Sequence, residues 1–153
     1  LIEETTEIIH KEVHRLICNT VSKNYNAIAE NFELKKTFKE MFQSSDTSPF
    51  YQLKKYYPEI FHKVMMHEIT ECNQLFKRNI EKGIEQGLYR KSLNIEYYAQ
   101  FYYHLIFSIK ENTSSEKEAH KLELEILEYH TRAMATPTGI IELEKNLLNT
   151  KIQ

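Results

Sequence analysis

The side chains that could bind a metal ion or transfer a proton lie in a few short stretches of the 153-residue chain. His10 and His14 are one helical turn apart, a spacing that can hold a metal ion from two sides. The zinc-protease pattern also needs Glu directly after the first His, and Lys11 occupies that position. Because no third ligand accompanies this pair, we predict no metal and no cofactor.

A second stretch, "HEITEC" (His67–Cys72), pairs His67 with Glu71 and Glu68 with Cys72 at the same spacing. The two pairs point in different directions around a helix, which disfavours a shared metal ion. Glu68 is more informative, because it lies at the edge of an apolar stripe. Its carboxylate is either solvated at that boundary or faces an internal cavity as a polar anchor, and both interpretations stay open.

Two further histidines lie in apolar surroundings. His104 stands in an aromatic segment beside Phe101 and Leu105. It is either a core or interface histidine with satisfied hydrogen bonds, or a group that orients a ligand. His130 lies on the apolar stripe of the following segment, and we interpret it as a helix–helix or subunit contact. No nucleophile is paired with a base at a catalytic spacing, so we expect a protein that is not an enzyme.

The elements that must position these residues are predicted to be helices. Three Gly, three Pro, no Trp and 41% hydrophobic residues indicate few turns and long helices. Apolar residues recur at helical spacing in the long segments, and no segment alternates as a strand would. We therefore predict an all-α fold, an antiparallel bundle of about six to seven helices that forms one domain over residues 1–153.

Local signals place the helix ends. Ser and Asn cluster at Ser22–Asn26, where we expect a weak break, and "SSDTSP" (Ser44–Pro49) is a predicted loop. Pro58 fits the first position of a long helix that runs to Gly87. Asn94 can cap the next helix, and Thr136 with Pro137 predicts the start of a last one.

Two of the three glycines, Gly83 and Gly87, are one helical turn apart. A membrane helix-dimer seam would need an apolar segment, and Glu81 and Lys82 lie directly beside them. A phosphate loop would need a strand before the glycines, whereas these follow a helical stripe. We therefore predict that Gly87 ends the helix with a positive φ, and that Gly83 admits a close neighbour.

Bulk composition excludes some classes of function. The net charge is −2, and acidic and basic residues are mixed along the chain. We therefore expect that this chain alone does not bind DNA. No apolar run approaches the length of a membrane span, and no signal-peptide pattern follows Leu1. We expect a cytoplasmic location with no membrane association, in which Cys18 and Cys72 are buried free thiols.

Several sequence landmarks occur in a particular order. "LKKYYPEIFHK" (Leu53–Lys63) precedes a long helix that ends in "NIEKGIEQGLYRKSLN" (Asn79–Asn94). An aromatic helix follows, and then "YHTRAMATPTGIIELEK" (Tyr129–Lys145). This order resembles the C-terminal regulatory domain of TetR-type transcriptional regulators, most clearly from Leu53 to Leu147. The resemblance leads us to expect a helix-turn-helix DNA-binding domain upstream of residue 1.

The resemblance also implies a function. It predicts a homodimer with a pocket inside each subunit, and release of operator DNA by the upstream domain of a repressor when a small-molecule effector binds. The Tyr-, Phe- and Met-rich interior favours an apolar or aromatic effector. The alternative is a stand-alone helical protein-interaction module whose aromatic core leaves no pocket.

Candidate site residues follow from helical facing. We expect a cavity between the helix from Pro58, the aromatic helix after Asn94 and the segment Phe38–Tyr57. Its predicted wall comprises Phe42, Tyr51, Phe61, Met65, Phe101 and His104, with Glu68 at the edge. The predicted dimer contact lies on the aromatic helix and the helix after it, and comprises Tyr98, Tyr102, Ile106, Leu122, Ile126, His130 and Ala133.

Overall fold

The computed structural model describes residues 2–42 and 49–152, apart from the side chain of Phe42. This part of the chain folds into eight helices, without a strand: α1 (Ile2–Ser22), α2 (Ala27–Phe42), α3 (Pro49–Tyr56), α4 (Pro58–Glu71), α5 (Asn73–Glu85), α6 (Ile95–Asn112), α7 (Glu116–Met134) and α8 (Pro137–Ile152). The predicted all-α bundle is confirmed.

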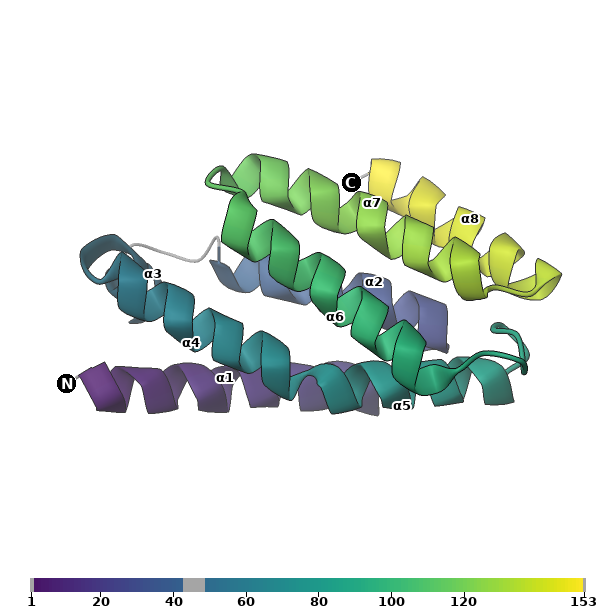
Figure 1. Cartoon of the computed structure of the whole chain (residues 1–153), viewed down its shortest axis with the longest axis horizontal. Helices are drawn as coiled ribbons and strands as arrows, with labels where there is room; N and C mark the ends of the chain where they lie inside the picture. The colour runs from purple at the N-terminus through teal and green to yellow at the C-terminus, as the bar shows by residue number, and fades with distance from the viewer. Residues whose placement is uncertain (1, 43–48, 153) are drawn as a thin grey trace.

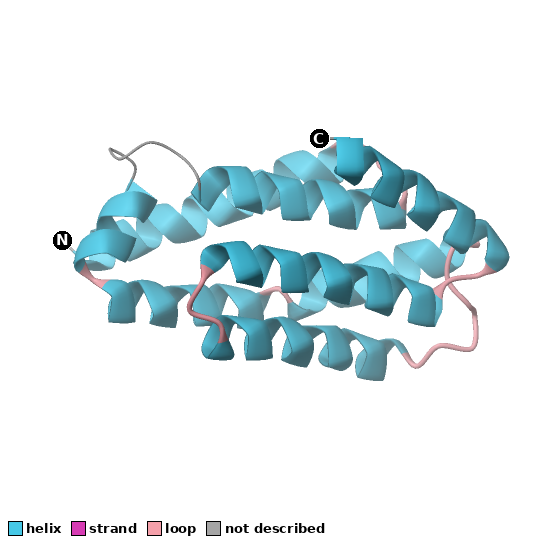
Figure 2. Cartoon of the chain, turned by 90° about the horizontal axis from the view of Figure 1, so that it is seen from above, coloured by secondary structure: helices cyan, strands magenta, loops and turns pink. Residues whose placement is uncertain are grey.

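The helices run roughly along one common direction, and α6 crosses the bundle obliquely (Figure 1). The helices α7 and α8 form an antiparallel pair on one side, and α1, α4 and α5 lie on the opposite side. In sequence order α6 packs against α4, α5 and α7, while α2 packs against α1, α5, α7 and α8. The view from above in Figure 2 shows the same elongated bundle, joined by short loops.

Most of the predicted helix ends are confirmed. The helix α1 ends at Ser22, and Asn24 follows with a φ of 54°. Pro58 is the first residue of α4, where its missing N–H leaves no hydrogen bond unmade. Asn94 caps α6, since its side chain accepts a hydrogen bond of 3.1 Å from the Tyr97 N–H. The loop predicted at 44–49 lies outside the described residues except for Pro49, which begins α3.

The single helix predicted from Pro58 to Gly87 is wrong, because the chain forms two helices there. The first ends at Glu71 and the second begins at Asn73, with Cys72 between them. Both helices pack against α6, but α4 also packs against α1 and α3, whereas α5 also packs against α2. The break lies where these additional neighbours change, and the apolar stripe of the sequence does not reveal that change.

Both predictions for the glycines are confirmed. Gly87 has a φ of +71°, a left-handed conformation that side chains with a Cβ rarely adopt. The backbone N–H groups of Leu88 and Tyr89 donate to the Gly83 carbonyl at 2.8 and 3.0 Å, which closes the end of α5. The ring of Tyr89 lies on Gly83, where a Cβ would be 2.1 Å from Cδ2.

The segment after Gly87 pairs with the turn between α7 and α8. Tyr89 and Ala135 form an isolated antiparallel bridge. The Arg90 N–H donates to the Met134 carbonyl at 2.9 Å, and the Thr136 N–H donates to the Leu88 carbonyl at 2.9 Å. These bonds tie the end of α5 to the start of α8, two points that are far apart in the sequence.

Two hydrophobic clusters fill the interior. The larger cluster joins α2, α5, α6, α7 and α8 through buried residues that include Ile28, Ile80, Leu127, Met134 and Leu143. The smaller cluster joins α1, α3 and α4 through Ile9, Val13, Phe50, Leu53 and Val64. The described part of the molecule therefore has two packed regions with a boundary between them.

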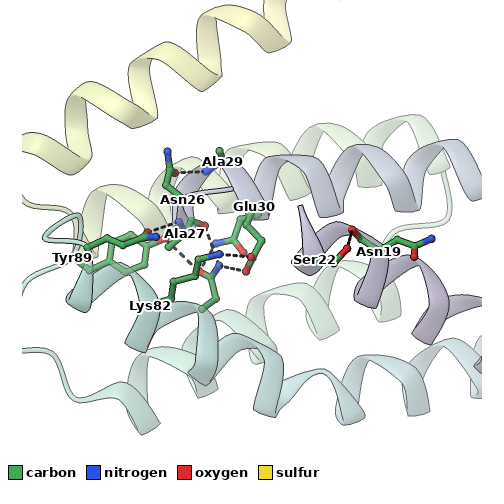
Figure 3. Close-up of polar contacts among 11 residues, drawn as sticks. Asn19, Ser22, Asn26, Ala27, Ala29, Glu30, Lys82 and Tyr89 are labelled. Atoms are coloured by element: carbon green, nitrogen blue, oxygen red, sulfur yellow. Dashed lines mark hydrogen bonds and ion pairs between the residues drawn. The ribbon is translucent and has the colours of Figure 1, made fainter. Parts of the chain in front are cut away.

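A buried polar network ties α2 to α5 within the larger packed region (Figure 3). The Asn79 amide donates to the Ala27 carbonyl at 2.9 Å and to Glu30 Oε1 at 3.1 Å. Lys82 Nζ donates to Glu30 Oε2 at 2.7 Å, and Figure 3 shows these two side chains pointing toward each other. Glu30 is a buried carboxylate, and this ion pair offsets the loss of its hydration.

Candidate functional site

A cavity of about 150 Å³ lies between the two hydrophobic clusters. Helices α1, α2, α4, α5, α6 and α7 contribute to its wall. Most of the wall is apolar: Val13, Leu34, Phe38, Met65, Ile69, Cys72, Leu75, Phe76, Tyr102 and Ile106. Small-molecule sites commonly combine such a wall with a few polar groups that fix orientation.

One end of the cavity is polar and is formed by three helices. Lys35 comes from α2, Lys110 from α6, and His120 and Glu123 from α7. Lys110 Nζ lies 2.6 Å from Glu123 Oε1, and Lys35 Nζ lies 3.7 Å from Glu123 Oε2. A single carboxylate thus holds two ammonium groups at the end of an otherwise apolar chamber.

Burial at this end disfavours the charged forms of its basic groups. The pKa of Lys35 is lowered mainly by loss of hydration, which the nearby Glu123 carboxylate only partly offsets. The pKa of His120 is also lowered mainly by burial, so its imidazole is neutral at pH 7. Its buried Nδ1 has no hydrogen-bond partner among the described residues.

Glu68 lies in the wall nearer to the smaller cluster. The residue is 4% exposed, and its Oε1 lies 2.8 Å from Nδ1 of His10 on α1. Glu68 is thus a buried residue of the cavity wall, which decides against the interpretation as a solvated boundary residue. The contact links α1 to α4 across the cavity edge, so the position of α1 is coupled to a group in the wall.

Cys72 also borders the cavity but does not fit the role of a nucleophile. Burial, together with the Glu68 and Glu71 carboxylates, raises the pKa of its thiol to about 11. The thiol is therefore protonated at neutral pH and weakly reactive. Cys18 is exposed, contrary to the prediction that both cysteines are buried.

The structure brings only part of the predicted wall together. Met65 and Glu68 line the cavity. Phe61 packs instead against the smaller hydrophobic cluster, and Tyr51 is half-buried on α3, with the Lys55 ammonium 5.5 Å from its ring centroid. The side chain of Phe42 lies outside the described residues.

The prediction that Phe101 and His104 face the cavity is wrong. Phe101 is 54% exposed, and His104 is exposed as well. The face of α6 that lines the cavity instead carries Tyr102, Ile106 and Lys110, spaced by one helical turn. Because α6 is aromatic nearly all round, its sequence pattern did not indicate which face turns inward.

The predicted dimer residues also divide. The rings of Tyr102 on α6 and His130 on α7 stack with centroids 4.4 Å apart, which confirms His130 as a helix–helix contact, and Tyr102 and Ile106 lie in the cavity wall. These three side chains therefore take part in packing within the subunit, and a contact of any of them across a dimer remains a prediction. Leu122 and Ala133 are exposed, while Tyr98 and Ile126 are half-buried.

The polar end of the cavity was missed in the sequence. Lys35 and Glu123 are 88 positions apart, so no local motif joins them. The only local signal is on α2, where Asn31, Lys35 and Phe38 share one helical face. A polar residue within an apolar stripe, such as Lys35 on α2, can indicate a cavity wall.

Two general features of the described residues bear on function. No group of three or more His, Cys, Asp or Glu side chains in this part of the chain could hold a metal ion. None of its helices combines the length and the hydrophobicity that a membrane crossing requires. No family model, curated protein or solved structure matches the chain.

Proposed function

We propose that this chain is the ligand-binding and dimerisation domain of a TetR-type transcriptional repressor. A small, largely apolar effector binds in the cavity between the two hydrophobic clusters and controls operator binding by a DNA-binding domain upstream of residue 1. The cavity is the observation that carries the proposal, because protein interiors are otherwise close-packed. The sequence landmarks from Leu53 to Leu147 supply the choice of family.

The position of the cavity suits a sensor. Its wall includes residues from helices of both hydrophobic clusters, so a ligand there contacts both packed regions at once. The His10–Glu68 contact joins α1 to this wall. A ligand that favours one arrangement of the helices shifts the population toward it, and α1 would carry that shift toward the upstream domain.

A two-fold dimer is the second part of the proposal. The outer faces of α7 and α8 expose several large apolar side chains: Leu122, Tyr129, Ile141, Leu148 and Ile152. Exposed apolar rows of this kind are typical of subunit contacts. The same rows also support the alternative, a helical interaction module, and ligand binding separates the two.

Thermal denaturation with a panel of small apolar and aromatic compounds tests the cavity. A compound at about 100 times its Kd should stabilise the domain by about 2.7 kcal/mol. Ile106→Phe, which fills the cavity from α6, should weaken binding, whereas Tyr97→Phe on the exposed face of α6 should not. If no compound raises the Tm of the wild type, the interaction module replaces the sensor.

The regulatory part has its own test. In the protein that includes the upstream DNA-binding domain, a compound that stabilises the wild-type domain should release operator DNA in an electrophoretic mobility shift. Ile106→Phe should retain DNA at the same compound concentration. Release that is equal in both proteins would show that the cavity does not control DNA binding.

A further inference from the structure

A second hollow adjoins the polar end of the cavity. This outer groove has a volume of about 630 Å³ and is lined by residues of α2, α7 and α8. Lys35, Lys39 and His120 line both the groove and the cavity. These three side chains therefore form the junction between an apolar chamber and a surface groove.

The outer groove is basic, although the whole chain carries a net charge of −2. Its walls contain two acidic residues, Glu33 and Glu116, and five lysines: Lys35, Lys36, Lys39, Lys117 and Lys121. Glu116 is already paired with Lys54 of α3. Of the five lysines, only Lys35 has an ion pair with another described residue, Glu123. The groove is thus a local excess of positive charge beside an apolar cavity.

The junction also contains polar groups that the protein itself does not fully satisfy. Lys35 Nζ donates to the His120 backbone carbonyl at 3.3 Å and lies 3.7 Å from Glu123. The His120 side chain is 20% exposed, and its Nδ1, 3.6 Å from Glu123 Oε2, makes no hydrogen bond with a described residue. A buried polar atom without a partner is unfavourable, so this position is suited to a polar group of a ligand.

We propose that the ligand is an amphiphilic anion, whose apolar chain occupies the inner cavity and whose anionic head lies at Lys35, Lys39 and His120 in the mouth of the basic groove. This proposal rests on the proposed sensor function and specifies its ligand class. Lys35 and Lys39 attract the head, and the Nδ1 of His120 is available for one hydrogen bond. The ten apolar side chains of the cavity wall surround the part of the chain that lies inside the cavity.

The lowered pKa of Lys35 agrees with this arrangement. Burial disfavours its ammonium form, and Glu123 is shared with Lys110. A bound anion would add a second opposite charge beside the Lys35 ammonium and would raise its pKa. A cationic ligand would instead add to the positive charge of three lysines at the junction and the cavity end, Lys35, Lys39 and Lys110.

Three probes with the same ten-carbon chain separate the head group from the chain: decanoate, decanol and decyltrimethylammonium, each below its micelle concentration. Isothermal titration at pH 7.5 should give at least a tenfold lower Kd for decanoate than for decanol, and the weakest binding for the cation. The decanoate Kd should rise with added salt, whereas the decanol Kd should not, because salt screens only the charged head.

Variants at the junction test the residues. Replacing both Lys35→Gln and Lys39→Gln should raise the decanoate Kd about tenfold and leave the decanol Kd unchanged. Lys91→Gln, an exposed lysine in the turn before α6, is the matched control and should change neither Kd. Decanol binding also reports that the double variant is folded, so a loss of decanoate binding alone is informative.

The outcomes separate this proposal from the sensor function. Equal binding of decanol and decanoate, insensitive to the double variant, would overturn the anionic head but leave the apolar cavity as a ligand site. If none of the three probes binds and no uncharged compound shifts the Tm, the sensor function fails as well. If the protein bound anionic phosphatidylglycerol vesicles but not monomeric decanoate, the proposal of a free amphiphilic ligand would be wrong. The basic groove would then be a contact for a membrane surface.

Discussion

At the scale of single residues, the glycines show how one missing side chain shapes this bundle. Gly83 allows the Tyr89 ring to lie on the surface of α5, and this ring is fully buried. Gly87 has no neighbour within 4 Å of an added Cβ, so only its backbone conformation requires glycine. The two positions therefore respond to the same substitution through different physical effects.

Replacing each glycine by alanine should separate these effects. Gly87→Ala should lower the free energy of unfolding by about 1 kcal/mol, through backbone strain at a φ of +71°. Gly83→Ala should lower it by more, up to about 3 kcal/mol, because the new Cβ forces the Tyr89 ring to move. Urea denaturation measures both values. A Gly83→Ala protein as stable as the wild type would show that the ring is not held there.

His130 makes stability depend on pH. Burial lowers its pKa from 6.5 to about 4, so the folded protein holds the ring neutral beneath Tyr102. Between pH 6.5 and pH 4 the unfolded chain binds more protons than the folded one. The free energy of unfolding is therefore highest above about pH 6.5. It falls by up to about 3 kcal/mol as the pH decreases toward 4, because His130 must then be protonated on unfolding.

The variant His130→Phe should remove this dependence, since it keeps an aromatic ring against Tyr102 and cannot take up a proton. When the pH is lowered from 7.5 to 4.5, the unfolding free energy of the wild type should fall by more than that of the variant. The lowered pKa of His120 acts in the same direction in both proteins and cancels in this difference. A difference that is constant with pH would contradict the burial of His130 as a neutral group.

At the scale of elements, the start of α8 depends on one hydroxyl. Thr136 Oγ1 accepts the Gly139 N–H at 3.1 Å, which caps the helix. The same hydroxyl donates to the Gly87 carbonyl at 2.6 Å and lies 3.2 Å from the Leu88 carbonyl. The side chain thus joins the end of α5 to the beginning of α8.

Thr136→Ala should therefore destabilise the domain by about 2 kcal/mol, at the upper end of the usual effect of losing a helix cap. Thr138→Ala is the matched control, because Thr138 is exposed in the first turn of the same helix. That control should change the unfolding free energy by less than about 0.5 kcal/mol. If chemical denaturation gave equal losses of unfolding free energy for the two substitutions, the Thr136 cap would not be the cause of the destabilisation.

At the scale of the whole molecule, the row of exposed apolar side chains on α7 and α8 predicts self-association. Sedimentation velocity at micromolar concentration should give a mass near twice the 18.3 kDa of one chain. Ile141→Lys and Leu148→Lys, at positions 73% and 60% exposed, should shift the protein toward the monomer. Ile8→Lys on α1, away from this pair of helices, is the control and should leave the mass unchanged. A wild-type protein that stays monomeric as its concentration rises would contradict the dimer.

The sequence by itself determined the helical class, most helix ends and the roles of the two neighbouring glycines. These features depend on interactions within a few residues: the spacing of apolar side chains, a cap such as Asn94, and the positive φ of Gly87. Met65 and Glu68 were also placed correctly in the cavity wall, because α4 has a clear apolar face with polar residues at its edge. Local chemistry was sufficient in each case.

Only the tertiary structure decided the break at Cys72, the inward face of α6 and the polar end of the cavity. The break lies where the additional neighbours change from α1 and α3, beside α4, to α2, beside α5. The face of α6 could not be inferred, since Phe101 outside and Tyr102 inside are chemically alike. Lys35, Lys110 and Glu123 meet only when three helices pack together. Such contacts join residues far apart in the chain, and no local pattern encodes which of them will meet.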